Sequence, residues 1–238
     1  MIIINDIRIS AVSENAILLE WPEKICPIQH QQIMQCQSLL TQSFKALIID
    51  TVAAYNSLMV YYHFEKIVVT TLFDKLQTLL AHIDDNDTQQ NALKPIIIPV
   101  YYGEDAGWDL LEVAKRLSIS IEDLIACHTK TSYQAYALGF TPGFCYLGQL
   151  DKKLQLPRRA SPRIKIPRGA VAIAEQQTAV YPNTSPGGWH IIGQAPIEMF
   201  TCQQDNFVPT ISVGQKVQFK AIDRQTFNEM GGKVECEN

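Results

Sequence analysis

The chain has 238 residues, a formal net charge of −4, 47% hydrophobic residues and 18% charged residues. This composition suits one or two domains with a buried core and is atypical of intrinsic disorder. Because the chain is acidic and has no basic stripe, we expect no nucleic-acid partner. No run of about 18 apolar residues occurs, so we also expect no membrane span.

The cysteines and the N-terminus indicate a reducing compartment. Six cysteines are scattered without a C-x-x-C pair, which favours reduced thiols over a zinc site or a disulfide framework. Residues 1–6 lack the basic region of a secretory signal. We therefore expect a cytoplasmic protein.

The first third of the chain predicts a small α+β domain. Alternating apolar residues predict two short strands within 7–21 around a turn at 13–15, and β-branched runs predict strands over 46–50 and 58–62. Apolar spacing predicts an amphipathic helix over 28–44. A second helix is predicted from Thr71, a candidate N-cap. Its buried face would comprise Leu72, Leu76, Leu79, Leu80 and Ile83.

Residues 84–91 contain no apolar side chain and predict a linker. We therefore expect two domains, an N-terminal α+β domain over 1–92 and a second domain over 93–238.

The second domain predicts short strands with a few helices. A strand is predicted over 96–102, in which Pro99 indicates an edge strand or a bulge. Helices are predicted from Asp109 to Leu117 and after Ser120, a candidate N-cap. Short apolar runs over 170–174, 189–192, 197–200 and 216–220, separated by turn residues, predict an all-β barrel or sandwich. Residues 231–238 predict a frayed tail.

Gly and Pro are concentrated in residues 136–193, and the loops there carry the candidate site. In the loop 139–146, Gly143 would bring backbone N–H groups close to an anionic or carbonyl ligand. Phe144 and Tyr146, with Phe140, would form the walls of a pocket. The alternative is a tight turn whose aromatic residues belong to the core.

A second Gly-rich loop covers Ser185 to His190. Gly187 and Gly188 permit an unusual backbone shape, Trp189 is a candidate pocket wall, and His190 is a weak candidate for a general base. The alternative is a hairpin turn with Trp189 in the core. No G-x-S-x-G surrounds Ser185, which argues against a serine hydrolase.

Five cations lie within eleven residues of this acidic chain: Arg158, Arg159, Arg163, Lys165 and Arg168. Guanidinium groups suit bidentate binding of carboxylates. We choose Arg163 as the ligand-binding cation because Pro162 and the adjacent strand 164–166 would stiffen its backbone. The alternative is a solvated basic face.

The sequence lacks a P-loop, a G-x-G-x-x-G after a strand, and any His, Asp or Glu cluster with metal spacing. We therefore expect no metal and no nucleotide held by a recognisable motif in this chain.

Several motifs together closely resemble the family of the B-type subunit of 5-oxoprolinase, also labelled allophanate hydrolase subunit 1, which includes a sporulation-kinase inhibitor and contains carboxyltransferase subdomains C and D. The motifs are Tyr136-x-Leu-Gly-Phe-x-Pro-Gly-Phe-x-Tyr-Leu-Gly148, Leu156-Pro-Arg-Arg-Ala-Ser-Pro-Arg163, Ile166-Pro-x-Gly169 and Ser185-Pro-Gly-Gly-Trp189. The resemblance extends over nearly the whole chain.

The resemblance implies a small N-terminal α+β domain followed by a cyclophilin-like β-barrel. It also implies the B-type subunit of an ATP-dependent 5-oxoprolinase complex that opens 5-oxo-L-proline to L-glutamate. The partners would be the A-type subunit of that complex and its C-type subunit, which is similar to biotin-dependent carboxylases. ATP would be used by the whole complex, and this chain alone would be inactive.

Two other functions remain open at this point: a regulatory module that inhibits a histidine kinase, and a carboxyltransferase-type component acting on urea or allophanate. A role for His190 as a base is not implied by the resemblance.

Overall fold

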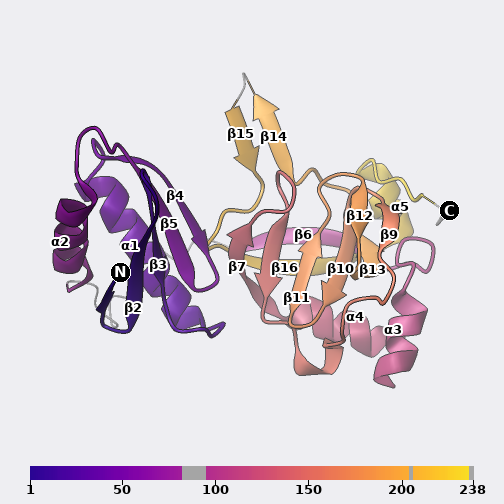
Figure 1. Cartoon of the computed structure of the whole chain (residues 1–238). Coiled ribbons are helices and arrows are strands. Elements are labelled where there is room, and N and C mark those ends of the chain that lie inside the picture. The colour runs from indigo at the N-terminus through magenta and orange to yellow at the C-terminus, as the bar shows by residue number, and fades with distance from the viewer. Residues whose placement is uncertain (82–94, 204–205, 236–238) are drawn as a thin grey trace. The chain divides into compact units, whose positions relative to one another are not determined.

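A computed structural model describes residues 1–81, 95–203 and 206–235 (Figure 1). By internal contacts the chain divides into two units, Met1–Ala92 and Leu93–Asn238. The predicted linker over 84–91 lies outside the described residues. Strands and helices occur in both units, so the predicted α+β class is confirmed.

The first unit is an antiparallel five-stranded sheet with two helices. The strand order is β1-β2-β3-β5-β4. The strands are β1 (Ile2–Ile4), β2 (Ile7–Ser13), β3 (Ala16–Glu20), β4 (Ile48–Ala54) and β5 (Ser57–Tyr62). The helices are α1 (Pro27–Ser43) and α2 (Val69–Leu80).

The two helices bury apolar positions that the sequence predicted, while the predicted Ile83 lies outside the described residues. Residues Ile33 and Leu40 of α1 and Leu72 and Leu76 of α2 are fully buried. The predicted N-cap of α2 is wrong, because the helix begins at Val69 after the extended Val68, and Thr71 lies within its first turn. An earlier start leaves the same residues on the buried face of the helix. The apolar spacing therefore predicted the helix correctly, although the predicted N-cap was wrong.

The second unit is built on a closed barrel with the strand order β10-β11-β8-β7-β16-β6-β13 (Figure 1). Neighbouring strands are antiparallel except β16 and β6, which are parallel. The barrel strands are β6 (Ile96–Tyr101), β7 (Ser132–Leu138), β8 (Cys145–Gly148), β10 (Ala170–Ala174), β11 (Gln177–Val180), β13 (His190–Gln194) and β16 (Lys216–Ile222). This architecture confirms the barrel alternative of the sequence prediction.

Helices α3 (Leu110–Leu117), α4 (Ile121–Lys130) and α5 (Arg224–Glu229) accompany the barrel, with a short 3-10 turn, η1, over Lys152–Leu154. Ser120 caps α4 as predicted, since its Oγ accepts from the backbone N of Asp123 at 3.0 Å. Pro99 was expected at an edge or a bulge, but β6 is a strand of the closed barrel and lies between β16 and β13. Strand β13 pairs with β6 only at Tyr101, so we attribute the tolerance of Pro99 to this short contact.

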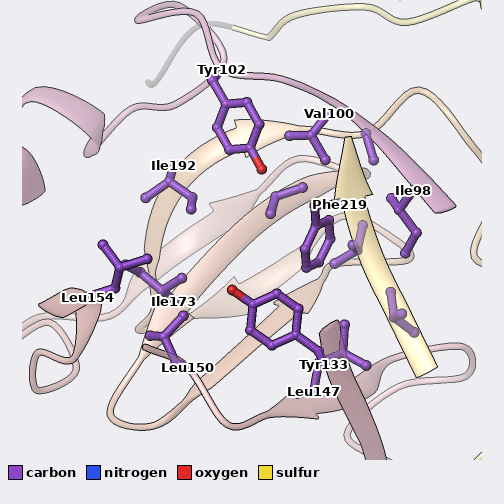
Figure 2. Close-up of a cluster of buried hydrophobic side chains, with 14 of the residues drawn as sticks. Ile98, Val100, Tyr102, Tyr133, Leu147, Leu150, Leu154, Ile173, Ile192 and Phe219 are labelled. Atoms are coloured by element: carbon purple, nitrogen blue, oxygen red, sulfur yellow. The ribbon is translucent and has the colours of Figure 1, made fainter. Parts of the chain in front are cut away.

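Apolar side chains fill the barrel interior (Figure 2), where Tyr102, Tyr133 and Phe219 lie among aliphatic residues. Their neighbour His128 is fully buried, with Nδ1 2.7 Å from Tyr102 Oη and Nε2 2.9 Å from Thr178 Oγ1. Because Thr178 Oγ1 donates its proton to the Ala172 carbonyl, it accepts from His128 Nε2. His128 is therefore neutral with its proton on Nε2, and burial lowers its pKa to about 3.

Two small sheets lie outside the barrel ladder. One pairs β9 (Arg163–Ile166) with β12 (Ser185–Gly187), and the other pairs β14 (Phe200–Gln203) with β15 (Asn206–Pro209). The predicted strand over 197–200 is wrong, because only Phe200 is in a strand. Met199 instead enters the barrel core from a loop, so its burial does not depend on a strand.

The prediction of a frayed C-terminus is wrong for the described residues 231–235. Gln194 Nε2 donates to the Lys233 carbonyl at 3.1 Å, and Trp108 Nε1 donates to the Glu235 carbonyl at 3.1 Å. Side chains distant in sequence thus bind two carbonyls of this segment, which the local composition does not reveal.

Candidate functional site

The loop between β7 and β8 takes a shape that requires glycine. Gly143 has a φ of +84°, and a Cβ there would lie 2.7 Å from Phe200 Cδ1. Two backbone bonds close the loop, from Gly139 N to the Phe144 carbonyl and from Phe144 N to the Thr141 carbonyl. Phe140, at its tip, has a φ of 72°, a strained value for a bulky residue.

This loop places Phe144 at the centre of an aromatic cluster. Its ring centroid lies 4.9 Å from Tyr146, 5.3 Å from Tyr181 and 5.9 Å from Trp189. Phe140 meets the same ring edge-on at 5.3 Å. Edge-to-face contacts of this kind are the favoured geometry for aromatic pairs.

A cavity of about 100 Å³ opens among these rings. Its lining comprises Phe140, Phe144, Tyr146, Arg158, Tyr181, Gly187, Gly188 and Trp189. Pockets for drug-sized ligands measure roughly 300–1,000 Å³, so this cavity suits a ligand of metabolite size. Its wall combines aromatic rings with one cation and two phenol groups.

Gly187, the last residue of β12, lines the cavity at a position where a side chain would clash. A Cβ on Gly187 would lie 2.3 Å from Tyr181 Oη and 2.7 Å from Ile166 Cδ1. Burial raises the pKa of Tyr181 to about 12, and burial also raises the pKa of Tyr146. Both phenols are therefore protonated near neutral pH and serve as hydrogen-bond donors.

Arg158 is the cation of the cavity wall. Its Nε lies 3.4 Å from Glu175 Oε1, and both side chains are more than half exposed, at 57% and 56%. An exposed pair of this kind contributes little to stability. The guanidinium is therefore available to exchange Glu175 for an anionic group of a ligand.

Arg163, the cation chosen from the sequence, is held by another residue. Its two terminal nitrogens bind both carboxylate oxygens of Asp109 at 2.7 and 2.9 Å. Its guanidinium carbon Cζ lies 5.4 Å from the ring centroid of Trp108. Arg163 thus fills a structural position, and it is absent from the cavity lining.

His190 is buried and also lies outside the lining. Its Nε2 is 3.0 Å from the Pro157 carbonyl, and burial lowers its pKa. The ring is therefore neutral, with Nε2 donating to Pro157. The side chain of Ser185 likewise does not line the cavity, and its Oγ is buried without a hydrogen-bond partner among the described residues.

The structure thus brings together Phe144, Tyr146, Gly187, Gly188 and Trp189, with Gly143 shaping the adjoining loop. Arg163, His190 and Ser185 are not among the residues that line this cavity. Whether the first group binds substrate stays a prediction. Sequence reasoning preferred Arg163 to Arg158, although both lie in the same basic run.

Asp109 was missed as a functional candidate and recognised only as the start of a helix. The sequence contains one signal, an Asp directly before α3, and that signal predicts a cap. The carboxylate makes no capping bond, since it binds distant groups instead.

Within the described residues, no three His, Cys, Asp or Glu side chains converge as metal ligands. None of the helices in those ranges has the length and apolar character to cross a bilayer.

Residues 7–210 match the protein family described as carboxyltransferase domain, subdomain C and D. The chain is 32% identical over 232 residues to the B-type subunit of 5-oxoprolinase from Bacillus subtilis (strain 168), covering 93% of this chain and 95% of that protein. It is 35% identical over 213 residues to the B-type subunit of 5-oxoprolinase from Haemophilus influenzae, covering 89% and 96% respectively.

Solved structures show the same fold. TTHA0988 is 31% identical with a TM-score of 0.76 over 87% of this chain, and the chain corresponds to only 40% of the length of TTHA0988. A conserved uncharacterized protein of Pyrococcus horikoshii, PH0987, is 32% identical with a TM-score of 0.54, covering 92% of this chain and all of that one. The urea amidolyase of K. lactis, at 15% identity and a TM-score of 0.71, matches over 97% of this chain and 16% of its own length, and shares the fold alone.

Proposed function

The chain belongs to the carboxyltransferase domain, subdomain C and D, family, together with proteins named as the B-type subunit of 5-oxoprolinase, and from this premise we propose that it has that place in an ATP-dependent 5-oxoprolinase. The complex would open 5-oxo-L-proline to L-glutamate with an A-type subunit plus a carboxylase-like C-type subunit. One observation carries the proposal: the family's Gly-rich loops build a small aromatic cavity with one guanidinium in its wall.

The shape and charge of the cavity suit this substrate. 5-Oxo-L-proline is a five-membered lactam ring with one carboxylate. In the proposed complex the ring lies against the aromatic rings that line the cavity, among them Phe144 and Trp189, and its carboxylate replaces Glu175 beside Arg158. The protonated hydroxyl groups of Tyr146 and Tyr181 are donors for the lactam oxygen or the carboxylate.

The chemistry requires more than this site provides. A lactam is resonance-stabilised, so the carbonyl must be activated before water attacks it, and ATP is the proposed source of activation. The net reaction consumes one water for the lactam and one for ATP, and yields glutamate, ADP and phosphate. Neither a P-loop nor a dinucleotide motif occurs in the chain, and we therefore assign ATP to another subunit.

The role of this chain is then to bind and orient the substrate. No side chain in the cavity lining is a general base at neutral pH, because the two phenols are protonated and the other polar groups, the Arg158 guanidinium and the Trp189 indole, only donate. His190 is buried away from the cavity and is assigned no catalytic step. Orientation of bound reactants is itself a large contribution to rate.

The test is to assay the three subunits singly and combined, with 5-oxo-L-proline and ATP, for ADP and glutamate. We expect both products only from the combined subunits. Full turnover by this chain alone would overturn the proposed division of labour. If activity instead required a biotin carrier and stopped with avidin, a carboxyltransferase role would replace this proposal.

A further inference from the structure

Asp109 is a buried carboxylate with a complete set of partners. Its side chain is 2% exposed. Oδ1 accepts from Arg159 at 2.5 Å and from Arg163 at 2.9 Å, while Oδ2 accepts from Arg163 at 2.7 Å and from the backbone N of Ile191 at 2.7 Å. Asp109 also donates its own N–H to the Ile191 carbonyl at 2.8 Å.

Each partner of Asp109 adjoins a segment of the cavity wall. Arg159 follows Arg158, and its backbone N donates to the Gly188 carbonyl at 2.8 Å. Arg163 pairs with Gly187 across the β9–β12 sheet. Ile191 follows Trp189 by two residues. The wall positions 158 and 187–189 are therefore all tied, directly or through a backbone bond, to one carboxylate.

From this geometry we propose that Asp109 is the positioning residue of the cavity. It holds Arg158 and the Gly187–Trp189 segment at their places in the wall by binding Arg159, Arg163 and Ile191 together. Asp109 lies outside the lining and does not touch the ligand. The identity of that ligand as 5-oxo-L-proline rests on the proposed function, whereas the positioning role rests on the contacts alone.

The charges make Asp109 difficult to replace. One carboxylate faces two guanidinium groups, so its neutralisation removes the negative charge that they share and leaves two partly buried cations side by side. Repulsion between them would move Arg159 and Arg163 apart, and with them the backbone that pairs with Gly188 and Gly187. The absence of a capping bond to α3 distinguishes this role from that of an ordinary helix cap.

The first experiment reads the cavity wall without any assay of activity. The full chain is labelled with 5-fluorotryptophan, and the three tryptophan resonances are assigned with Trp→Phe variants. In Asp109→Asn we expect the ¹⁹F resonance of Trp189 to shift or broaden at a temperature where the chain is folded. The resonance of Trp21, in the first unit, is expected to remain unchanged.

The second experiment separates positioning from stability. In the combined subunits, misplacement of the wall by Asp109→Asn should raise the KM for 5-oxo-L-proline about tenfold to a hundredfold. A merely structural role would lower the active fraction, and thus the apparent kcat, at unchanged KM. Asp105→Asn is the matched control, because Asp105 pairs with Arg224 at an exposed place away from the lining.

Arg163→Lys is the milder variant if Asp109→Asn fails to fold, because it keeps the charge and loses the bidentate fork. We expect the same changes in smaller degree. An unchanged Trp189 resonance together with an unchanged KM in the folded variant would overturn the inference. If the unsubstituted complex does not act on 5-oxo-L-proline, the proposed function fails while the ¹⁹F spectrum still decides the role of Asp109.

Discussion

The buried His128 should make the barrel unit lose stability as the pH falls. Its pKa is lowered to about 3 in the folded chain by burial, against an ordinary value of about 6.5 in the unfolded chain. Between these values the unfolded state binds a proton that the folded state does not. The contribution of the neutral His128 to the free energy of unfolding is therefore fully present above pH 6.5. It is lost progressively as the pH falls toward 3.

The size of this loss follows from the two pKa values. Between pH 7 and pH 5.5, preferential protonation of the unfolded state costs about 1.2 kcal/mol of unfolding free energy. With a urea m-value of about 1–3 kcal/mol per molar, the transition midpoint should shift by about 0.4–1.2 M. The hydrogen bonds to Tyr102 and Thr178 hold His128 as the neutral tautomer and resist the proton uptake.

The assay is urea unfolding followed by tryptophan fluorescence in a Trp21→Phe background, where both remaining tryptophans belong to the barrel unit. His128→Gln is compared with its parent at both pH values. The variant should be less stable at pH 7, and its pH-dependent loss should be smaller by about 1.2 kcal/mol. If parent and variant lost the same free energy on acidification, the buried neutral His128 would be refuted.

Two further substitutions test local geometry. Gly187→Ala places a Cβ 2.3 Å from Tyr181 Oη, so it should raise the KM for 5-oxo-L-proline and lower the melting temperature, with a cost of about 1–3 kcal/mol; unchanged kinetics would contradict the tight fit. Ser120→Ala removes the cap bond to Asp123 and should cost about 1 kcal/mol in urea unfolding, leaving KM unaltered. A cost near zero would show that this cap is dispensable.

Local chemistry made much of the fold predictable. Ser120 caps α4 because the N-cap bond joins residues three apart, within reach of sequence inspection. The buried faces of α1 and α2 follow from apolar spacing. The Gly-rich loops were recognised from the density of Gly and Pro, and in the structure a Cβ on Gly143 or Gly187 would clash with a neighbouring side chain.

Long-range pairing was not predictable from composition. Asp109 and Arg163 are 54 residues apart, and nothing near either one shows that a bidentate pair forms. The choice between Arg158 and Arg163 depended on that pair. A fixed backbone was the reason for choosing Arg163, yet Arg163 pairs with Asp109 and is not among the residues that line the cavity. The C-terminal segment likewise depends on Trp108 and Gln194, which lie far away in sequence.

The central claim is that the cavity binds the carboxylate of the lactam substrate. The substitution Arg158→Ala in the combined subunits tests this claim most directly. The matched control is Arg8→Ala, which breaks another exposed Arg–Glu pair, in the first unit. Loss of a charge-assisted bond to the substrate should raise the KM for 5-oxo-L-proline about tenfold to a hundredfold in Arg158→Ala only. Equal KM values for both variants and the unsubstituted chain would contradict the account.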